Sequence, residues 1–256
     1  MPRSVFAGCR FPPEIIVLAV RWYLRFGLSY RDVEELLGER GVTVDHVTIF
    51  RWVQRFTAEL IDAARPCRHA IGGRWFVDET YVRVASIWRY VYRALDHRGQ
   101  VIDILVSARR DGASARRFFH RALGEHARPE QVTTDKAKAL IGAVQHVLPE
   151  AEHDTSIYAN NRVECDHGRL KARLTPMRGL QSDRTASIVI RGHAFVQNLR
   201  RGHYEVGVDP INDQLRLQSP VVALDEVVRV HDAHVVLGVR EQGPRWHRST
   251  PSPCGS

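Results

Sequence analysis

The chain is 256 residues long, with 44% hydrophobic residues and a formal net charge of +8. This length fits one catalytic domain of about 150 residues and a smaller module, but not several large domains. The composition excludes an extended disordered chain, a collagen-like repeat and a coiled coil. The longest apolar stretch near the start covers residues 15–20 and is far shorter than the roughly 20 residues of a membrane span. We therefore expect a globular, basic protein that is neither inserted into a membrane nor secreted.

The surplus positive charge lies in the middle of the chain. Residues 71–204 hold 22 Lys and Arg against 14 Asp and Glu, whereas residues 1–70 carry a net +2 and residues 205–256 a net −2. A basic surface favours a polyanionic partner, but many ordinary proteins are basic, so charge alone does not identify one. The four cysteines form no CxxC pair, which argues against a disulfide framework or a cysteine zinc site and suits a reducing cytosol.

The first 62 residues predict an all-α module of three helices. Apolar residues recur with the helical period over residues 13–27. Ser29 followed by Asp32 resembles the capping box of a short second helix. The third helix is expected over about residues 43–60, starting at residue 43 or 45.

The third predicted helix carries Thr48, Arg51 and Arg55 on its outward side. A helix, a turn with glycine and a helix with exposed Arg and Thr are typical of a helix-turn-helix, whose last helix enters the DNA major groove. A three-helix packing module with a solvated charged face has the same periodicity, so the pattern leaves both interpretations open. Residues 63–73 contain one proline and two adjacent glycines and are predicted to be a linker.

Residues 74–205 predict an α/β domain with a mixed sheet and flanking helices. Three antiparallel strands rich in Val, Tyr, Trp and Ile are expected first, at residues 74–84, 88–95 and 101–107. The elements expected next are a helix (residues 113–126), a strand (131–134), a helix (136–148), a polar loop (149–159) and two helices (160–174 and 184–199). This order of elements is that of a ribonuclease-H-like fold.

The end of the chain is less regular. Residues 206–237 are predicted to be a C-terminal extension, apolar enough from residue 221 onward for short strands or a helix. Residues 238–256 are rich in Pro, Ser, Gly, Arg and His and are predicted to be a disordered tail.

Three acidic residues of the α/β domain are candidates for a metal-dependent site. Asp78 interrupts an apolar strand, where a carboxylate needs a partner or a metal unless it faces solvent. Asp135 follows a strand and precedes a helix, so capping that helix is an alternative role. Glu164 lies in a helix among many cations, where a surface ion pair is the usual explanation. The residues alone leave these alternatives open.

Helical spacing orients the residues around Glu164. Asn161, Glu164 and Lys171 share one face that borders the buried side, which suits residues directed toward the two aspartates. Asp166 and Arg173 are predicted to point away from that side.

His167 lies on the neighbouring apolar stripe of the same helix. A histidine there is more often a hydrogen-bonded core residue than a ligand, although it could orient a carboxylate or a phosphate.

Three convergent carboxylates suit the cleavage of phosphodiester bonds. Negative charge develops on the attacking and the leaving oxygen, and two Mg²⁺ ions held by carboxylates can stabilise both. In this interpretation Asp78 bridges both ions, Asp135 holds one and Glu164 holds the other. Lys171 is expected to contact a DNA phosphate, and Mn²⁺ is expected to replace Mg²⁺.

Several segments resemble the bacterial insertion-sequence DDE transposases of the IS-six type. The most specific are FVDETYVRV, WRYVYRALDHRG, TTDKA and YANNRVECDHGRLKAR. The similarity extends over roughly residues 9–205 and includes FPPEIIVLAVRWYLRFGLSYRDVEELL, MRGL and SDRTASIVIRGH. By this resemblance Asp78 and Asp135 correspond to the two catalytic aspartates, Glu164 to the catalytic glutamate and Lys171 to the basic residue seven positions later.

The resemblance implies a ribonuclease-H-like core, Mg²⁺ dependence and binding of terminal inverted repeats by the N-terminal module. It also implies a homo-oligomer assembled on double-stranded DNA. DNA cleavage is expected to expose 3′-hydroxyls, which then attack target DNA. The expected location is the bacterial cytoplasm, in association with the nucleoid and without a membrane partner.

The sequence departs from the family pattern at two places. Only 28 residues separate Asp135 from Glu164, fewer than the family usually has, and the shortening falls in the predicted polar loop. The stretch after about Leu217 does not match the family's ending. A decayed copy or regulator that only binds DNA, and a metal-dependent nuclease without strand transfer, therefore stay open as alternatives.

Overall fold

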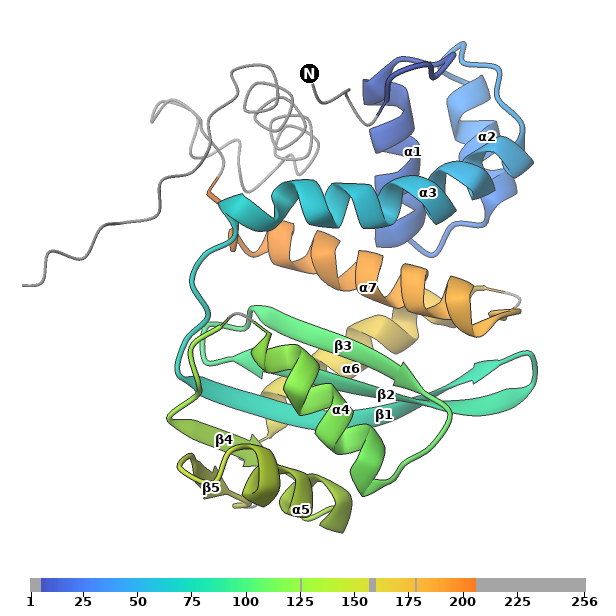
Figure 1. Cartoon of the computed structure of the whole chain (residues 1–256). Coiled ribbons are helices and arrows are strands. Elements are labelled where there is room, and N and C mark those ends of the chain that lie inside the picture. Colours follow the sequence, from blue (N-terminus) through green and yellow to red (C-terminus); the bar gives the residue numbers. More distant parts are fainter. Residues whose placement is uncertain (1–5, 125, 157–159, 178, 206–256) are drawn as a thin grey trace, which may run out of the picture.

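The computed structural model describes residues 6–124, 126–156, 160–177 and 179–205. Within these ranges, three N-terminal helices precede a five-stranded mixed sheet that carries helices on both faces (Figure 1). No helix of this described part is long and apolar enough to cross a membrane. The extension and tail predicted for residues 206–256 lie outside the described residues.

The N-terminal part contains the three predicted helices. They are α1 (Pro13–Arg25), α2 (Tyr30–Gly38) and α3 (His46–Ala64). The capping box of α2 is confirmed, because the Asp32 amide donates to the Ser29 hydroxyl and the Ser29 amide donates to the Asp32 carboxylate. Asp45 caps α3 by accepting hydrogen bonds from two amides of its first turn. Local capping chemistry therefore fixes where these helices begin.

The sheet has the strand order β3-β2-β1-β4-β5. Its strands are β1 (Arg74–Val84), β2 (Ile87–Asp96), β3 (Val101–Ser107), β4 (Gln131–Thr134) and β5 (Glu152–Asp154). The first three form the predicted antiparallel meander, while β4 pairs parallel with β1 and β5 pairs parallel with β4. The α/β fold class with a mixed, ribonuclease-H-like sheet is confirmed.

Strand β5 corrects the expectation of a polar loop over residues 149–159. It consists of three polar residues, Glu-His-Asp, at the edge of the sheet, so it shows no apolar alternation that a sequence pattern could reveal. The short segment between Asp135 and Glu164 therefore still adds a strand to the sheet.

Helices cover both faces of the sheet. One face carries α4 (Gly112–Leu123) and α5 (Lys138–Val147), and the other carries α6 (Asn161–Leu174) and α7 (Asp183–Arg200). In β1, Trp75 and Val77 pack in the cluster of α4 and α5, whereas Phe76 packs in the cluster of α6 and α7. Because side chains alternate along a strand, the next two positions of β1 also face opposite sides of the sheet.

Helix α7 lies between the N-terminal helices and the sheet (Figure 1). Most of its residues from Ala186 to Leu199 are buried, so the amphipathic helix expected here is enclosed on several sides. One buried cluster includes Leu24 of α1, Phe56 of α3, Val189 of α7 and Phe76 of β1. The N-terminal helices and the sheet thus share a continuous core through α7.

Candidate active site

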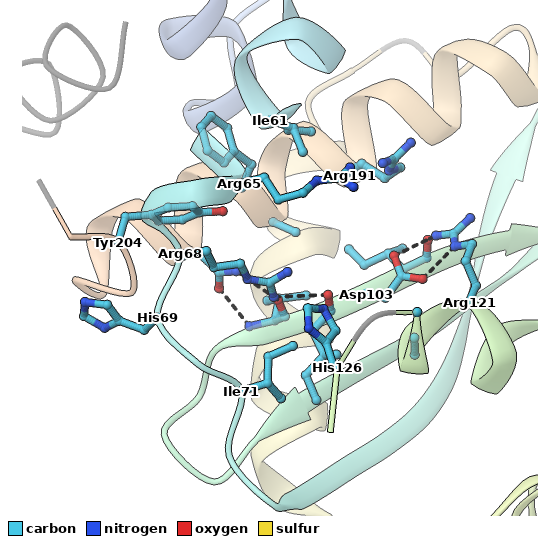
Figure 2. Close-up of a pocket in the computed structure, with 18 of the residues that line it drawn as sticks. Ile61, Arg65, Arg68, His69, Ile71, Asp103, Arg121, His126, Arg191 and Tyr204 are labelled. Atoms are coloured by element: carbon cyan, nitrogen blue, oxygen red, sulfur yellow. Dashed lines mark hydrogen bonds and ion pairs between the residues drawn. The ribbon is translucent and has the colours of Figure 1, made fainter. Parts of the chain in front are cut away.

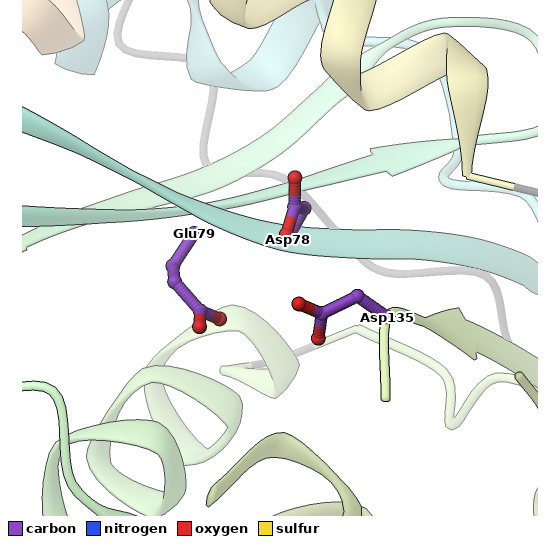
Figure 3. Close-up of side chains that lie close together, drawn as sticks. All are labelled: Asp78, Glu79 and Asp135. Atoms are coloured by element: carbon purple, nitrogen blue, oxygen red, sulfur yellow. The ribbon is translucent and has the colours of Figure 1, made fainter. Parts of the chain in front are cut away.

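The parallel pairing of β1 and β4 brings two of the predicted site residues together. Val77 lies opposite Thr134, so Asp78 and Asp135 follow at adjacent positions of neighbouring strands. One carboxylate oxygen from each of Asp78, Glu79 and Asp135 lies within 4.8 Å of the other two (Figure 3). The edge where β4 ends therefore gathers three acidic side chains.

Glu79 is the member of this group that the sequence reasoning missed. Strand alternation directs it to the α4 side of the sheet, where its side chain is 3% exposed. Its charge is met by Arg110 from the β3–α4 connection, whose Nε and Nη2 both contact Oε1. An acidic Asp-Glu pair inside an apolar strand was the available signal.

Arg110 also approaches Asp135, with its Nη2 atom 3.9 Å from Oδ2. Burial would lower the pKa of Arg110, but the Glu79 and Asp135 carboxylates outweigh it and raise that pKa. Burial and the charge of Asp135 raise the pKa of Glu79, against the opposing effect of Arg110. One guanidinium therefore supplies the positive charge beside two of the three acids.

Asp78 has the most perturbed carboxyl group of the site. Burial raises its pKa to about 7, and the charges of Asp135, Glu79 and Glu164 add to that shift. His167 Nδ1 lies 3.5 Å from Asp78 Oδ2. Burial lowers the pKa of His167 to about 3, with Arg93 contributing, so the imidazole next to Asp78 is neutral at pH 7.

Glu164 lies close enough to raise the pKa of Asp78 but is not one of the three acids within 4.8 Å. Its side chain, like those of Asn161 and Lys171 on the same helix, is exposed. The start of α6 is attached to β1 because the Asn160 amide group donates to the Val77 carbonyl at 3.0 Å. The structure thus places Glu164 beside the acidic group rather than inside it.

Two predictions about α6 are wrong. Asp166 and Arg173 were expected to point away from the buried side, but both are buried. Asp166 accepts hydrogen bonds from Arg93 of β2 and from Arg201 after α7. Arg173 donates to the Tyr23 carbonyl of α1. Helical spacing shows only which face a residue occupies, whereas these charges are buried because other elements supply their partners.

Lys171 and the predicted contacts of α3 lie at the surface. The Lys171 ammonium sits 5.3 Å from the centre of the Tyr81 ring. Arg51 and Arg55 are exposed, as expected, and Arg55 pairs with a glutamate one turn later on α3. Thr48 is only half-exposed, and its hydroxyl donates to the capping Asp45 carboxylate at 2.7 Å.

The donor set of the acidic group fits a hard divalent cation. Carboxylate oxygens are the ligands that such cations prefer. The high pKa of Asp78 reflects its burial first and the repulsion of the neighbouring carboxylates second. A bound cation would relieve this repulsion. The acidic group Asp78, Glu79 and Asp135 is therefore a candidate site for divalent metal.

A cavity of about 560 Å³ lies elsewhere, between the segment before β1, strand β3 and α7 (Figure 2). Several of its charged side chains make internal contacts. Arg68 donates to the backbone carbonyls of Val101 and Ile102, and Arg121 pairs with Asp103 at 2.6 Å. These pairings make the cavity part of the scaffold that holds β3 in place.

Comparisons with known proteins agree with the resemblance. Residues 72–203 match a family model described as a DDE domain. The transposase for insertion sequence-like element IS431mec of Staphylococcus aureus is 35% identical over 219 residues, covering 82% of this chain and 96% of that protein. The transposase for insertion sequence element IS257 in transposon Tn4003, also from Staphylococcus aureus, shows the same identity and coverage.

Solved structures give a looser match. The catalytic core domain of HTLV-2 integrase, in complex with magnesium, is 15% identical with a TM-score of 0.41, covering 59% of this chain and 98% of that chain. The family model, by contrast, matches more than half of this chain, and the staphylococcal relatives are matched over nearly their whole length. The chain belongs to the insertion-sequence DDE transposases of the IS-six type.

Proposed function

We propose that this protein binds the terminal inverted repeats of an insertion sequence, cleaves the DNA to expose 3′-hydroxyls and joins them to target DNA. The observation that carries the proposal is the convergence of Asp78 and Asp135 on neighbouring parallel strands in a domain of this family. Phosphodiester chemistry needs anionic ligands for divalent cations at one point of a rigid scaffold, and the sheet supplies that scaffold.

The proposed catalytic and metal-binding residues are Asp78, Asp135 and Glu164. Two Mg²⁺ ions held there would stabilise the attacking and the leaving oxygen, and Mn²⁺ would replace them. Asp78 occupies the central position because Asp135 lies beside it and Glu164 is near enough to shift its pKa. The Glu164 side chain is exposed on the first turn of α6, so it has to turn toward Asp78 to complete the set.

Two neighbours support the carboxylates in this proposal. The neutral imidazole of His167 stands 3.5 Å from Asp78 and fixes the orientation of that carboxyl group. Asn161, on the first turn of α6, supports the approach of Glu164. Lys171 lies two turns after Glu164 on the same helix and is proposed to contact a DNA phosphate next to the scissile bond.

The N-terminal helices are the proposed reader of the terminal repeats. Arg51 and Arg55 are exposed on α3, the third helix of the arrangement, and are proposed to contact DNA in the major groove. Thr48 is proposed to contact DNA at the start of the same helix. The domain boundaries proposed with this assignment are residues 1–62 for the DNA-binding module and 74–205 for the catalytic domain.

The proposed partners are double-stranded DNA, as terminal repeats and as target, and further copies of this chain on that DNA. The basic central segment favours these contacts through neutralisation of phosphates. The proposed place of action is the bacterial cytoplasm at the nucleoid.

A cleavage and joining reaction tests the proposal. Purified protein, labelled terminal-repeat duplex and Mg²⁺ are expected to give nicked ends and joined products. Asp78→Asn, Asp135→Asn and Glu164→Gln are expected to abolish both products while leaving duplex binding unchanged. The matched control is Glu150→Gln, which removes an exposed acid distant in sequence from all three and should leave both products intact.

Other outcomes support the alternative functions. Duplex binding without any cleavage by the unmodified protein would identify a decayed copy or a regulator. Nicked ends without joined products would identify a nuclease that lacks strand transfer. The pairing of β5 with β4 favours the transposase, because the shortened segment between Asp135 and Glu164 still completes the sheet.

A further inference from the structure

Four arginines surround a cavity of about 310 Å³ where the end of α1 meets α6 and α7. They are Arg25 from the last turn of α1, Arg169 and Arg173 from α6, and Arg200 from the last turn of α7. None of the described residues that line this cavity is acidic. We refer to these four residues and their cavity as the arginine pocket.

The positive charges of the arginine pocket are poorly compensated. Within the described ranges, neither Arg25 nor Arg200 forms an ion pair with an acid. Arg169 lies 3.6 Å from an Asp166 oxygen, but Arg93 and Arg201 share that carboxylate. The pocket therefore concentrates cations without a matching number of anions.

Arg173 adds a buried charge to the pocket. The residue is 3% exposed, and its Nη2 donates to the Tyr23 carbonyl. Its Nε and Nη1 atoms are buried and have no hydrogen-bond partner in the part of the chain that the structure describes. The guanidinium lies 4.8 Å from the centre of the Tyr23 ring, so Arg173 contributes a buried positive charge to the wall of the pocket.

Neighbouring cations repel one another around the pocket. Burial lowers the pKa of Arg25, and Arg200 lowers it further. Burial, Arg25 and Arg200 lower the pKa of Arg21 in the same way. His193 in the pocket wall does not add charge, because burial lowers its pKa to about 4. An anion in the pocket would reduce this repulsion.

We propose that the arginine pocket binds a phosphate of the DNA backbone where the duplex passes from the N-terminal helices to the active site. Guanidinium groups match phosphate oxygens in charge and in hydrogen-bond geometry. The pocket lies between the N-terminal helices and the helix that carries Glu164. Arg25 belongs to the N-terminal helices, and Arg169 follows Glu164 by five residues, about 7.5 Å along α6. The identity of the ligand as DNA rests on the proposed function.

Duplex binding by the full chain tests this proposal. Anisotropy is measured without divalent metal over a range of salt, with a terminal-repeat duplex and a random duplex of equal length. Arg25→Gln and Arg200→Gln are each expected to weaken binding by about tenfold at low salt, and by the same factor for both duplexes. Each should also reduce the slope of log affinity against log salt by about one, because a phosphate contact carries no sequence information.

The matched control is Arg116→Gln, which removes the same charge from an exposed position of α4, on the other face of the sheet. It is expected to leave the affinity and the salt slope unchanged. An equal loss in this control would overturn the proposal, since overall charge would then explain the effect. A loss confined to the terminal-repeat duplex would also overturn it, because base contacts rather than a phosphate would be involved.

Thermal melting distinguishes a loss of binding from a loss of stability. It also distinguishes a DNA phosphate from a free anion as the ligand. Without DNA, Arg200→Gln is expected to melt at or above the unmodified protein, since repulsion is relieved; a melting temperature lower by several degrees would assign a structural role and overturn the proposal. Inorganic phosphate is expected to raise the melting temperature of the unmodified protein and not that of Arg25→Gln/Arg200→Gln. If phosphate stabilises only the unmodified protein but Arg25→Gln/Arg200→Gln binds duplex as tightly as the unmodified protein, the pocket is a free-anion site and the DNA assignment is overturned.

The two proposals fail in distinguishable ways. If the unmodified protein binds no duplex, the proposed function fails, and the phosphate measurement still decides whether the pocket binds phosphate. If duplex binding and cleavage are intact in Arg25→Gln/Arg200→Gln, the arginine pocket alone is refuted.

Discussion

Arg110 holds the buried carboxylate of Glu79 at the edge of the acidic group. Its Nε and Nη2 contact the same Glu79 oxygen, and Nη2 lies 3.9 Å from Asp135. The guanidinium is half-exposed, whereas Glu79 is 3% exposed, so the acid depends on a partner that reaches it from the surface. This contact fixes the β3–α4 connection next to the candidate metal site.

Replacing Arg110 is therefore expected to destabilise the protein in a pH-dependent manner. Arg110→Met leaves a buried carboxylate without its partner, which should lower the free energy of unfolding by about 1–3 kcal/mol near pH 8. The pKa of Glu79 is already raised and should rise further, so the folded state binds a proton more readily than the unfolded state. The loss should therefore be smaller near pH 5 than near pH 8.

Denaturant unfolding at the two pH values measures this difference. The control is Glu79→Gln/Arg110→Met, which removes both charges and should recover most of the stability lost near pH 8. Equal losses at both pH values in Arg110→Met would contradict the role given to the ion pair.

Asp78 gives the metal-free protein a second pH dependence. Its pKa is about 7 in the folded state against an ordinary value of 3.8. The folded state therefore binds the extra proton between these values, and stability falls as pH rises through that window. Asp78→Asn removes the ionisable group, so near pH 8 it should be more stable than the unmodified protein by roughly 2–4 kcal/mol. Near pH 4 the two should be similar.

Melting curves of both proteins in chelator, from about pH 4 to about pH 8, test this expectation. Mg²⁺ should raise the melting temperature of the unmodified protein near pH 8, because metal binds the deprotonated carboxylate, and should have little effect on Asp78→Asn. Parallel pH profiles for the two proteins would refute the raised pKa.

Asp166 is expected to contribute far more to the stability of the fold than an aspartate in an exposed ion pair. It is 1% exposed, and Arg93 and Arg201 outweigh the effect of burial so that its pKa is lowered. A lowered pKa means that the carboxylate contributes stability at neutral pH, which is lost as pH falls. Asp166→Asn leaves Arg93, which is fully buried, without a counter-charge and should lower the unfolding free energy by about 3–5 kcal/mol at pH 7.

The same substitution at a surface pair is the control for Asp166→Asn. Asp62 pairs with Arg65 at 2.7 Å, but both side chains are largely exposed. Asp62→Asn should therefore change the unfolding free energy by less than about 1 kcal/mol. Comparable effects at the two positions would contradict the importance of the buried pair.

The elements with a strong hydrophobic period were predictable from the sequence. The strand at residues 74–84 was predicted with the bounds of β1, and the helices around Val163 and Val189 were placed within two residues. The nearness of Asp78 and Asp135 was expected from the family resemblance, not from periodicity. The strand pairing explains it, because Val77 in the middle of β1 lies opposite Thr134, the last residue of β4.

Features that depend on distant partners were not predictable. Glu79 joins the acidic group because Arg110, 31 residues away, neutralises it. Asp166 is buried because its two arginines come from β2 and from the end of α7. Periodicity assigns a residue to a face but carries no information about which charge of another element lies opposite that face. The arginine pocket was missed for the same reason, since it forms only where three helices meet.

The close packing of α7 against the N-terminal helices depends on Gly192. A Cβ atom at this position would lie 2.7 Å from side-chain carbons of both Leu24 in α1 and Thr57 in α3. All three residues are buried in the shared core, so the neighbours have little room to move. Gly192→Ala should gain about 0.5–1 kcal/mol of helix preference but lose about 1–3 kcal/mol through overpacking. The expected net result is destabilisation.

Gly142 in α5 provides the matched control, because a Cβ atom there would meet nothing within 4 Å. Gly142→Ala should keep only the helix preference and stabilise the protein by about 0.5–1 kcal/mol. Chemical unfolding of both variants therefore gives shifts of opposite sign. If both substitutions stabilise the protein, α7 is packed more loosely against α1 and α3 than the structure indicates, and the continuous core between the N-terminal helices and the sheet is weaker than inferred.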